Sequence, residues 1–237
     1  MAHVGGWLQR YVALKVLRSA WERSLAAISE TEILAHADYG DPDGARGVVR
    51  LIDRFLHEGP KGGHICVVLE RLGDDLGAVL RRFGRPGLPL PAVKEVCRQV
   101  LVALDYLHRE LRAVHGGVRP ENVLLVSPLE SSGEKGLAGA DLRCKLAGFG
   151  TAVWAEYARC EKMQRREYRS PEVLLGADYS AASDVWSLAC LCFELATGEA
   201  LFDPCEGDDF DEEDVRRRHA ATCSTFCTRV EASARED

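Results

Sequence analysis

The chain has 237 residues, of which 46% are hydrophobic and 28% are charged, and its formal net charge at pH 7 is −7. This length and composition suit a globular protein with one domain or two small lobes, and they exclude a disordered or fibrous chain. The negative charge argues against a general nucleic-acid binder, because such proteins present basic surfaces. We therefore expect no direct contact with nucleic acid.

Membrane and secretion signals are missing from the sequence. The longest apolar run, VWSLACLCFELA at 185–196, contains Glu194 and falls short of the roughly 18–20 residues that span a bilayer. Residues 1–10 contain no apolar signal-peptide core. The nine Cys residues form no C-x-x-C pair, which favours reduced thiols over a zinc site. We expect no membrane segment and an intracellular location, in the cytoplasm, the nucleus or both.

The first part of the chain is predicted to be rich in strands. Residues 11–17, YVALKVL, form a β-type apolar run that contains Lys15. In 21–37 apolar residues recur at helical spacing, which predicts a helix. Two further apolar runs, 48–56 and 64–72, flank a Gly-Pro turn and predict a hairpin. The order is therefore strand, helix, strand, strand.

From residue 89 the hydrophobic period becomes helical. Residues 89–111 predict a long amphipathic helix, and Pro89 and Pro91 mark its start. One apolar stripe runs along it, formed by Val93, Val96, Val100, Leu104 and Leu107.

Short strands and one apolar helix are expected in the rest of the chain. Residues 122–126 and 144–149 predict two strands, separated by a Ser/Gly-rich loop. Residues 180–198 are apolar almost all round, which predicts a central buried helix. The end of the chain, 203–237, begins with an acidic run and has no apolar periodicity, so we expect a poorly ordered tail.

These elements predict an α+β fold with two lobes and a cleft between them. The expected division is a small β-rich lobe over 1–72, a larger helical lobe over 73–202, and the acidic run and tail over 203–237.

Several short motifs in a fixed order suggest a family. They are VALK (12–15), HGGVRPEN (115–122), GFG (148–150), YRSPE (168–172) and SDVWS (183–187). Together they resemble the signature set of the eukaryotic protein kinases. The sequences of residues 88–108 and 166–204 are similar to those of the SR-protein kinases. This resemblance covers about residues 11–215 and implies a kinase fold, ATP and Mg²⁺ as cofactors, and arginine–serine-rich proteins as substrates or partners.

The resemblance assigns nucleotide-binding roles in the small lobe. Lys15 would contact the α- and β-phosphates and pair with Glu30 on the helix. The backbone of Glu70 and Leu72 would bind adenine, with Leu69 at the back of the pocket. The alternatives are an ordinary surface Lys–Glu pair and a plain strand end.

The segment that resembles the catalytic loop lacks its working carboxylate. The family pattern is His-x-Asp-x-Lys-Pro-x-Asn, in which Asp accepts the hydroxyl proton, Lys contacts the γ-phosphate and Asn binds Mg²⁺. His115, Pro120 and Asn122 match this pattern, whereas Gly117 stands at the Asp position and Arg119 at the Lys position. Loss of a general base alone typically costs about 10²–10⁴ in rate. We therefore name no confident catalytic residue.

A second carboxylate is also replaced. In GFG, Gly148 stands where the family has the Asp that binds Mg²⁺. Asn122 is then the one remaining expected metal ligand, although Mg²⁺ is normally held by one or two carboxylates. Asp184 is expected to accept hydrogen bonds from the catalytic loop, to cap its helix, or to do both.

Both ends of the motif set differ from a complete kinase. No Gly-rich hairpin precedes Val12, and the helices that usually end the large lobe are expected to be missing after about residue 215. Nucleotide binding is therefore expected to be weak or absent, and Glu172 is expected to be unpaired or to face solvent. The acidic run 203–214 would hold arginine-rich substrates or would simply be solvated.

Three functional readings follow. The first is a catalytically impaired SR-protein-kinase-like protein, a pseudokinase that acts through binding. The second is an active serine/threonine kinase in which Glu121, Asp141 or Glu156 compensates for the lost carboxylates. The third is a binding module or truncated product without a settled function. The oligomeric state is not predicted.

Overall fold

The computed structural model describes most of the chain. The described residues are 11–17, 21–60, 62–128, 142–159, 163–202 and 219–221. Most of the expected tail, 203–237, lies outside this described part.

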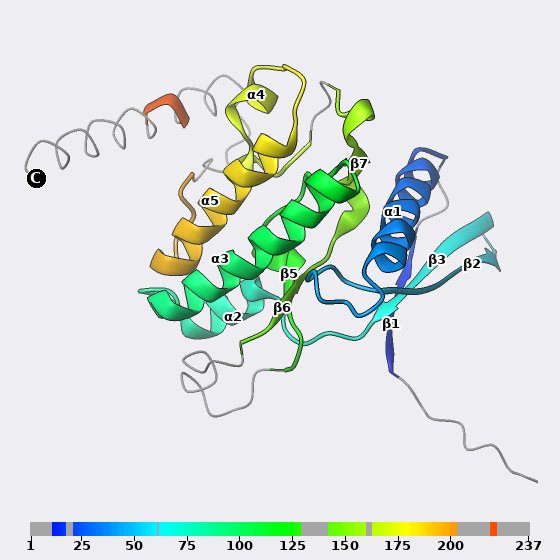
Figure 1. Ribbon diagram of the computed structural model, residues 1–237, viewed down its shortest axis with the longest axis horizontal. Coiled ribbons are helices and arrows are strands. Elements are labelled where there is room, and N and C mark those ends of the chain that lie inside the picture. Colours follow the sequence, from blue (N-terminus) through cyan, green and yellow to red (C-terminus); the bar gives the residue numbers. More distant parts are fainter. Residues whose placement is uncertain are drawn as a thin grey trace, which may run out of the picture.

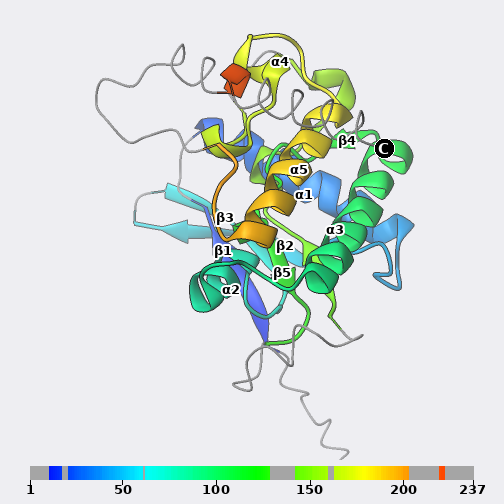
Figure 2. The same ribbon diagram turned by 90° about the vertical axis from the view of Figure 1, so that its left-hand side faces the viewer.

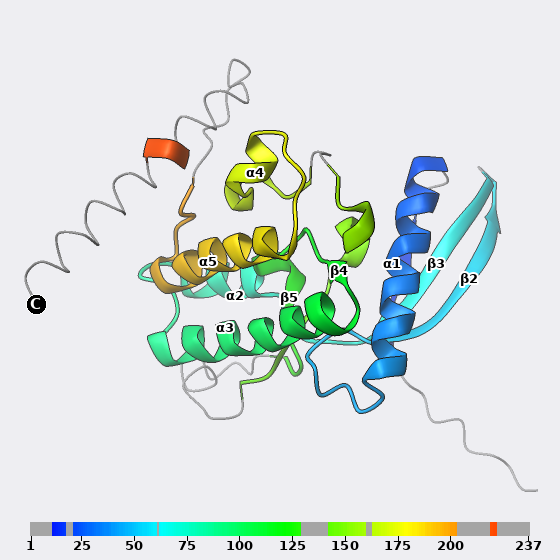
Figure 3. The same cartoon turned by 45° about the horizontal axis from the view of Figure 1, so that its top comes forward.

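The first lobe is a small antiparallel sheet with one helix against it (Figure 1). Its strands are β1 (Val12–Val16), β2 (Leu51–Gly59) and β3 (Gly62–Glu70), and their order in the sheet is β1-β3-β2. Helix α1 (Trp21–Gly40) lies beside β2 and β3, as Figure 3 also shows. Lys15 is opposite Val67 in the register of β1 and β3, next to this helix.

The second lobe is mostly helical. Its α-helices are α2 (Leu76–Phe83), α3 (Leu90–Asp105), α4 (Pro171–Leu174) and α5 (Ala181–Thr197). A π-helical turn, Tyr106–Glu110, continues α3. Figure 2 shows α3 and α5 side by side, and these two helices are in contact.

Short strands and turns connect these helices. Strand β4 (Ala113–Val114) pairs with β7 (Val153–Trp154), and β5 (Val123–Leu125) pairs with β6 (Cys144–Leu146). Single 3-10 turns lie at Pro120–Asn122, Phe149–Thr151, Ala155–Tyr157 and Arg166–Tyr168. The catalytic-loop segment therefore lies between β4 and β5.

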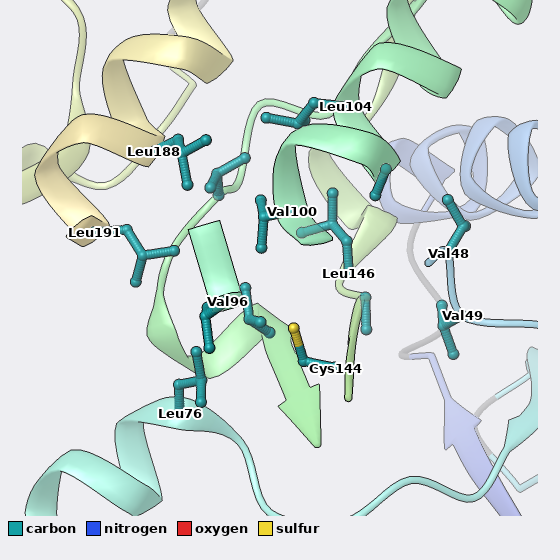
Figure 4. Close-up of a cluster of buried hydrophobic side chains, with 14 of the residues drawn as sticks. Val48, Val49, Leu76, Val96, Val100, Leu104, Cys144, Leu146, Leu188 and Leu191 are labelled. Atoms are coloured by element: carbon teal, nitrogen blue, oxygen red, sulfur yellow. The ribbon is translucent and has the colours of Figure 1, made fainter. Parts of the chain in front are cut away.

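One continuous hydrophobic core joins α1, α3, β6 and α5 (Figure 4). The five apolar residues of the predicted helix stripe are all buried in this core, and Leu107, the last of them, lies in the π-helical turn that continues α3. Burial of a large aliphatic side chain contributes about 1.5–3 kcal/mol, so the stripe fixes the position of α3 against β6 and α5. Phe149 and Leu146 are fully buried in the same core, which holds the segment after β6 in place.

The predicted two-lobed α+β fold is confirmed, with three local differences. Helix α2 was not predicted, although Asp75 accepts a hydrogen bond from Ala78 N as its N-cap. Strand β2 begins at Leu51, three residues later than expected. Helix α5 buries only one side within the described part, and Val185 is half exposed.

Length and hydrophobicity were compared along the described helices. None of them is both long and apolar enough to span a bilayer.

Candidate active site

Lys15 and Glu30 meet between the sheet and α1. Lys15 Nζ donates to both carboxylate oxygens of Glu30, at 2.8 Å to Oε1 and 2.7 Å to Oε2. The Glu30 side chain is 3% exposed and the Lys15 side chain 39% exposed, so Lys15 is the accessible member of the pair. This geometry is the expected pair, held by the register of β1 on β3 and by the packing of α1.

The end of β3 is anchored to both lobes. Glu70 Oε1 accepts hydrogen bonds from Lys145 Nζ at 2.6 Å and from Arg50 N at 2.9 Å. Glu70 N donates to Arg50 O at 3.0 Å. Leu69 and Leu72 are partly buried against the core. The side chain of Glu70 thus fixes the connection between the lobes, while adenine binding by the backbone here stays a prediction.

Asp184, on α5, binds the backbone of the catalytic-loop segment. Its carboxylate is fully buried and accepts from His115 N, Gly116 N and His108 Nε2, each at 2.8 Å. Ser180, not Asp184, caps α5, and it forms a capping box with Ser183. The loop-binding role expected for Asp184 is therefore present in the geometry.

His115 is a buried imidazole with both ring nitrogens engaged. Nε2 lies 3.0 Å from Ala147 O, and Nδ1 accepts from Gly117 N at 3.2 Å. A carbonyl can only accept and an N–H can only donate, so His115 is the neutral tautomer with its proton on Nε2. Its ring lies edge-on to Phe149 at 4.7 Å between centroids. Burial lowers the pKa of His115 below its ordinary value.

Stability is expected to fall at acidic pH because of His115. Since its pKa is lowered in the folded chain, the unfolded chain takes up a proton below about pH 6.5 that the folded chain resists. The free energy of unfolding should fall with pH there, by at most about 1.4 kcal/mol per pH unit. Denaturation of wild type and His115→Asn at several pH values checks this. The variant should show the flatter slope, and equal slopes would contradict the assignment.

The two glycines at the carboxylate positions are surrounded by other side chains. A Cβ built on Gly117 would lie 2.7 Å from Thr151 Oγ1, closer than real Cβ contacts. Gly148 has φ of +78°, and a Cβ on it would overlap the side chain of Asn122. Asn122 Nδ2 in turn donates to Gly117 O at 2.7 Å. The amide of Asn122 thus occupies the space into which a side chain at position 148 would project.

The residues here do not fit the Mg²⁺ that the family implies. Mg²⁺ is usually held by carboxylates together with phosphates and water. A cavity of about 490 Å³ extends from Lys15 past Asn122 to Ser187, and none of its described lining residues is Asp or Glu. Within the described residues no group of three or more His, Cys, Asp or Glu side chains is arranged to hold a metal ion.

The residues considered as replacements do not supply this carboxylate. Glu121 lies 3.7 Å from Arg119 Nε and 3.8 Å from Arg165 Nη1, between two cations. Glu156 is exposed in the turn after β7 and does not line the cavity. Asp141 lies outside the described residues.

Gln164 is a structural residue that the sequence reasoning missed. It is buried with a positive φ of 62°, and its amide bonds Ser183 O, Ser187 Oγ and Ser170 N. These bonds tie the segment before α4 to α5. The available signal was a glutamine shortly before the motif YRSPE, but its burial and its bonds to Ser183 and Ser187 on α5 could not be read from the sequence.

The expectation for Glu172 is wrong. Ser183 Oγ donates to Glu172 Oε1 at 2.5 Å, and the Glu172 side chain is only partly exposed. The cause is the position of Ser183 in the first turn of α5, where its hydroxyl reaches the carboxylate of Glu172 in α4.

Comparison with known proteins shows the family of this chain. A family model described as a protein kinase domain matches residues 6–235. The chain is 37% identical over 248 residues to the serine/threonine-protein kinase SRPK of Physarum polycephalum, covering 86% of this chain and 58% of that protein. It is 28% identical to protein kinase dsk1 of Schizosaccharomyces pombe, covering 87% and 59%. It is 24% identical to SRSF protein kinase 3 of Mus musculus, covering 89% and 67%.

The chain therefore belongs to the protein kinase family. Within that family it is SR-protein-kinase-like, as the named relatives indicate. It spans 58% and 59% of the length of the first two of these relatives.

Proposed function

We propose that this chain is a pseudokinase: a serine/threonine protein kinase homologue of the SR-protein-kinase type that does not transfer phosphate. The observation that carries the proposal is the position of Asn122. Its amide donates a hydrogen bond to Gly117 O and lies in the space beside Gly148. The Asn122 side chain therefore contacts both positions that would supply carboxylates.

Each missing carboxylate removes a separate part of the chemistry. A carboxylate at position 117 would accept the proton of the attacking hydroxyl, and one at position 148 would hold Mg²⁺ against the phosphates. Loss of a general base costs about 10²–10⁴ in rate. We do not multiply the two losses, because residues that act as a unit are not additive. Mg²⁺-dependent ATP binding is part of the same proposal and is expected to be weak.

Arginine–serine-rich proteins are the proposed partners. The relative named SRSF protein kinase 3 supports this class of partner. The acidic run 203–214, which would attract such basic sequences, lies outside the described residues. Binding without phosphorylation would let the chain compete with active kinases for the same partners.

A phosphotransfer assay tests the proposal directly. Purified chain, ATP, Mg²⁺ and an arginine–serine peptide should give no phosphate incorporation above the background of a Lys15→Ala variant. Lys15→Ala is the suitable control because it removes the ion pair with Glu30, which is the part of the expected kinase site that is intact. Robust transfer that disappears in Lys15→Ala would favour the alternative of an active kinase with compensating residues.

A further inference from the structure

The cavity between the lobes is lined by cations. Among its described lining residues Lys15, Arg119 and Arg165 are charged, and all three are positive. Its volume of about 490 Å³ lies within the range of small-molecule sites. A metal-dependent phosphate site mixes carboxylates with cations, whereas this one offers cations alone.

Glycines form a second part of the lining. Gly116, Gly117, Gly148 and Gly150 all border the cavity, so much of its wall is backbone. The position of a Cβ on Gly150 would be 3.6 Å from Lys15 Nζ. A phosphate oxygen can therefore approach the ammonium group of Lys15 without meeting a side chain at position 150.

Each of these cations has a carboxylate partner outside the cavity lining. Glu30 binds Lys15 from α1 and is almost fully buried. Glu121 lies 3.7 Å from Arg119 and 3.8 Å from Arg165, and Glu167 lies 3.6 Å from Arg165. None of the three carboxylates is among the lining residues. The cavity thus meets the positive ends of these pairs.

Arg119 has an unused donor. Its Nε is buried without a hydrogen-bond partner, and so is Glu121 Oε2. Their separation of 3.7 Å is too long for a hydrogen bond. Leaving a buried donor unsatisfied costs about 1–3 kcal/mol, and more for a charged group. An anionic ligand that draws the Arg119 guanidinium toward it would supply an acceptor.

We propose that this cavity binds the phosphate groups of a di- or triphosphate anion without a divalent cation. The proposal rests on the pseudokinase function given above. An uncomplexed phosphate chain carries more negative charge than its Mg²⁺ complex, and only cations line the cavity to meet that charge. Mg²⁺ should therefore weaken binding, which is the opposite of its effect in an active kinase.

Titration of the full chain tests the sign of the Mg²⁺ effect. Sodium tripolyphosphate and ATP are titrated calorimetrically in EDTA and then in excess MgCl₂. We expect measurable binding in EDTA and an apparent affinity at least about tenfold weaker in MgCl₂. Tighter binding of ATP than of tripolyphosphate would identify a nucleotide as the ligand, and equal binding would identify the phosphate chain alone.

Single substitutions locate the bound anion. Arg119→Ala and Arg165→Ala should each weaken binding in EDTA several-fold, because charge-assisted hydrogen bonds to phosphate are lost. Arg109→Ala removes the same charge from an exposed residue that does not line the cavity, and it should leave binding nearly unchanged. The unfolding midpoint of each variant without ligand shows that it has folded.

Three results would overturn the inference: no binding in EDTA, stronger binding with Mg²⁺, or equal effects of Arg109→Ala and the cavity variants. The phosphotransfer assay separates this failure from that of the proposed function. If the chain neither binds phosphate in EDTA nor transfers it, only the inference of metal-free binding fails and the pseudokinase proposal stands. If the chain requires Mg²⁺ and transfers phosphate, both the inference and the pseudokinase proposal fail.

Discussion

Replacement of Asp184 by alanine is expected to lower the free energy of unfolding by about 3–5 kcal/mol. The substitution leaves the N–H groups of His115 and Gly116 buried without an acceptor, and it also removes the partner of His108. Chemical denaturation measures the loss. This carboxylate is the main link between α5 and the loop that carries Gly117.

Asp75→Ala provides the matched control. Asp75 accepts one backbone hydrogen bond, from Ala78 N at 2.8 Å, and it is only partly buried at the start of α2. Its loss should cost about 1 kcal/mol, which is typical of a helix N-cap. If Asp184→Ala cost no more than Asp75→Ala, Asp184 would not be the organising residue of the loop.

Gly148→Ala is expected to cost about 3 kcal/mol, for two separable reasons. A left-handed backbone at φ of +78° costs a residue with a Cβ about 1–2 kcal/mol. The rest comes from overlap with the side chain of Asn122. In an Asn122→Ala background the overlap is gone, so Gly148→Ala should then cost only the backbone part. Denaturation of the two single variants and the double variant measures this coupling.

Gly47→Ala isolates the backbone part independently. Gly47 has φ of +77°, and a Cβ on it would meet its nearest neighbours at 3.7 Å, which is ordinary van der Waals contact. The substitution should therefore cost about 1–2 kcal/mol, in either background. An equal cost for Gly148→Ala and Gly47→Ala would mean that Asn122 does not occupy the space at position 148.

The same overlap bears on any attempt to restore the carboxylates. A side chain at 148 has to displace Asn122, and one at 117 has to displace the hydroxyl of Thr151. Neighbouring side chains therefore lie in the space beside both glycines, and we expect that simple replacement by Asp does not rebuild a metal site.

Helices and strands were predictable where a hydrophobic period encodes them, whereas the Lys15–Glu30 pair was expected from the resemblance to the protein kinases. The stripe of α3 follows from the helical period, and Pro89 marks its start as expected. Asp184 was expected to bind the catalytic loop because the order of the motifs indicated it, and its hydrogen bonds agree.

The details that decide the chemistry depend on contacts between distant residues. The orientation of the Asn122 amide depends on Gly117 and Gly148, which no period links. The partner of Glu172 is Ser183, eleven residues away on another helix. The cationic lining also brings Lys15 together with Arg119 and Arg165 from opposite lobes. None of these contacts follows from spacing along the chain.

The described residues of the cleft offer no site for a divalent cation. Mn²⁺ titration followed by electron paramagnetic resonance measures it directly, because free Mn²⁺ gives a signal that is lost on binding. We expect wild type and Asn122→Ala to take up the same amount of Mn²⁺, since any uptake then comes from acidic groups elsewhere. A Mn²⁺ ion that wild type binds and Asn122→Ala does not would contradict the account.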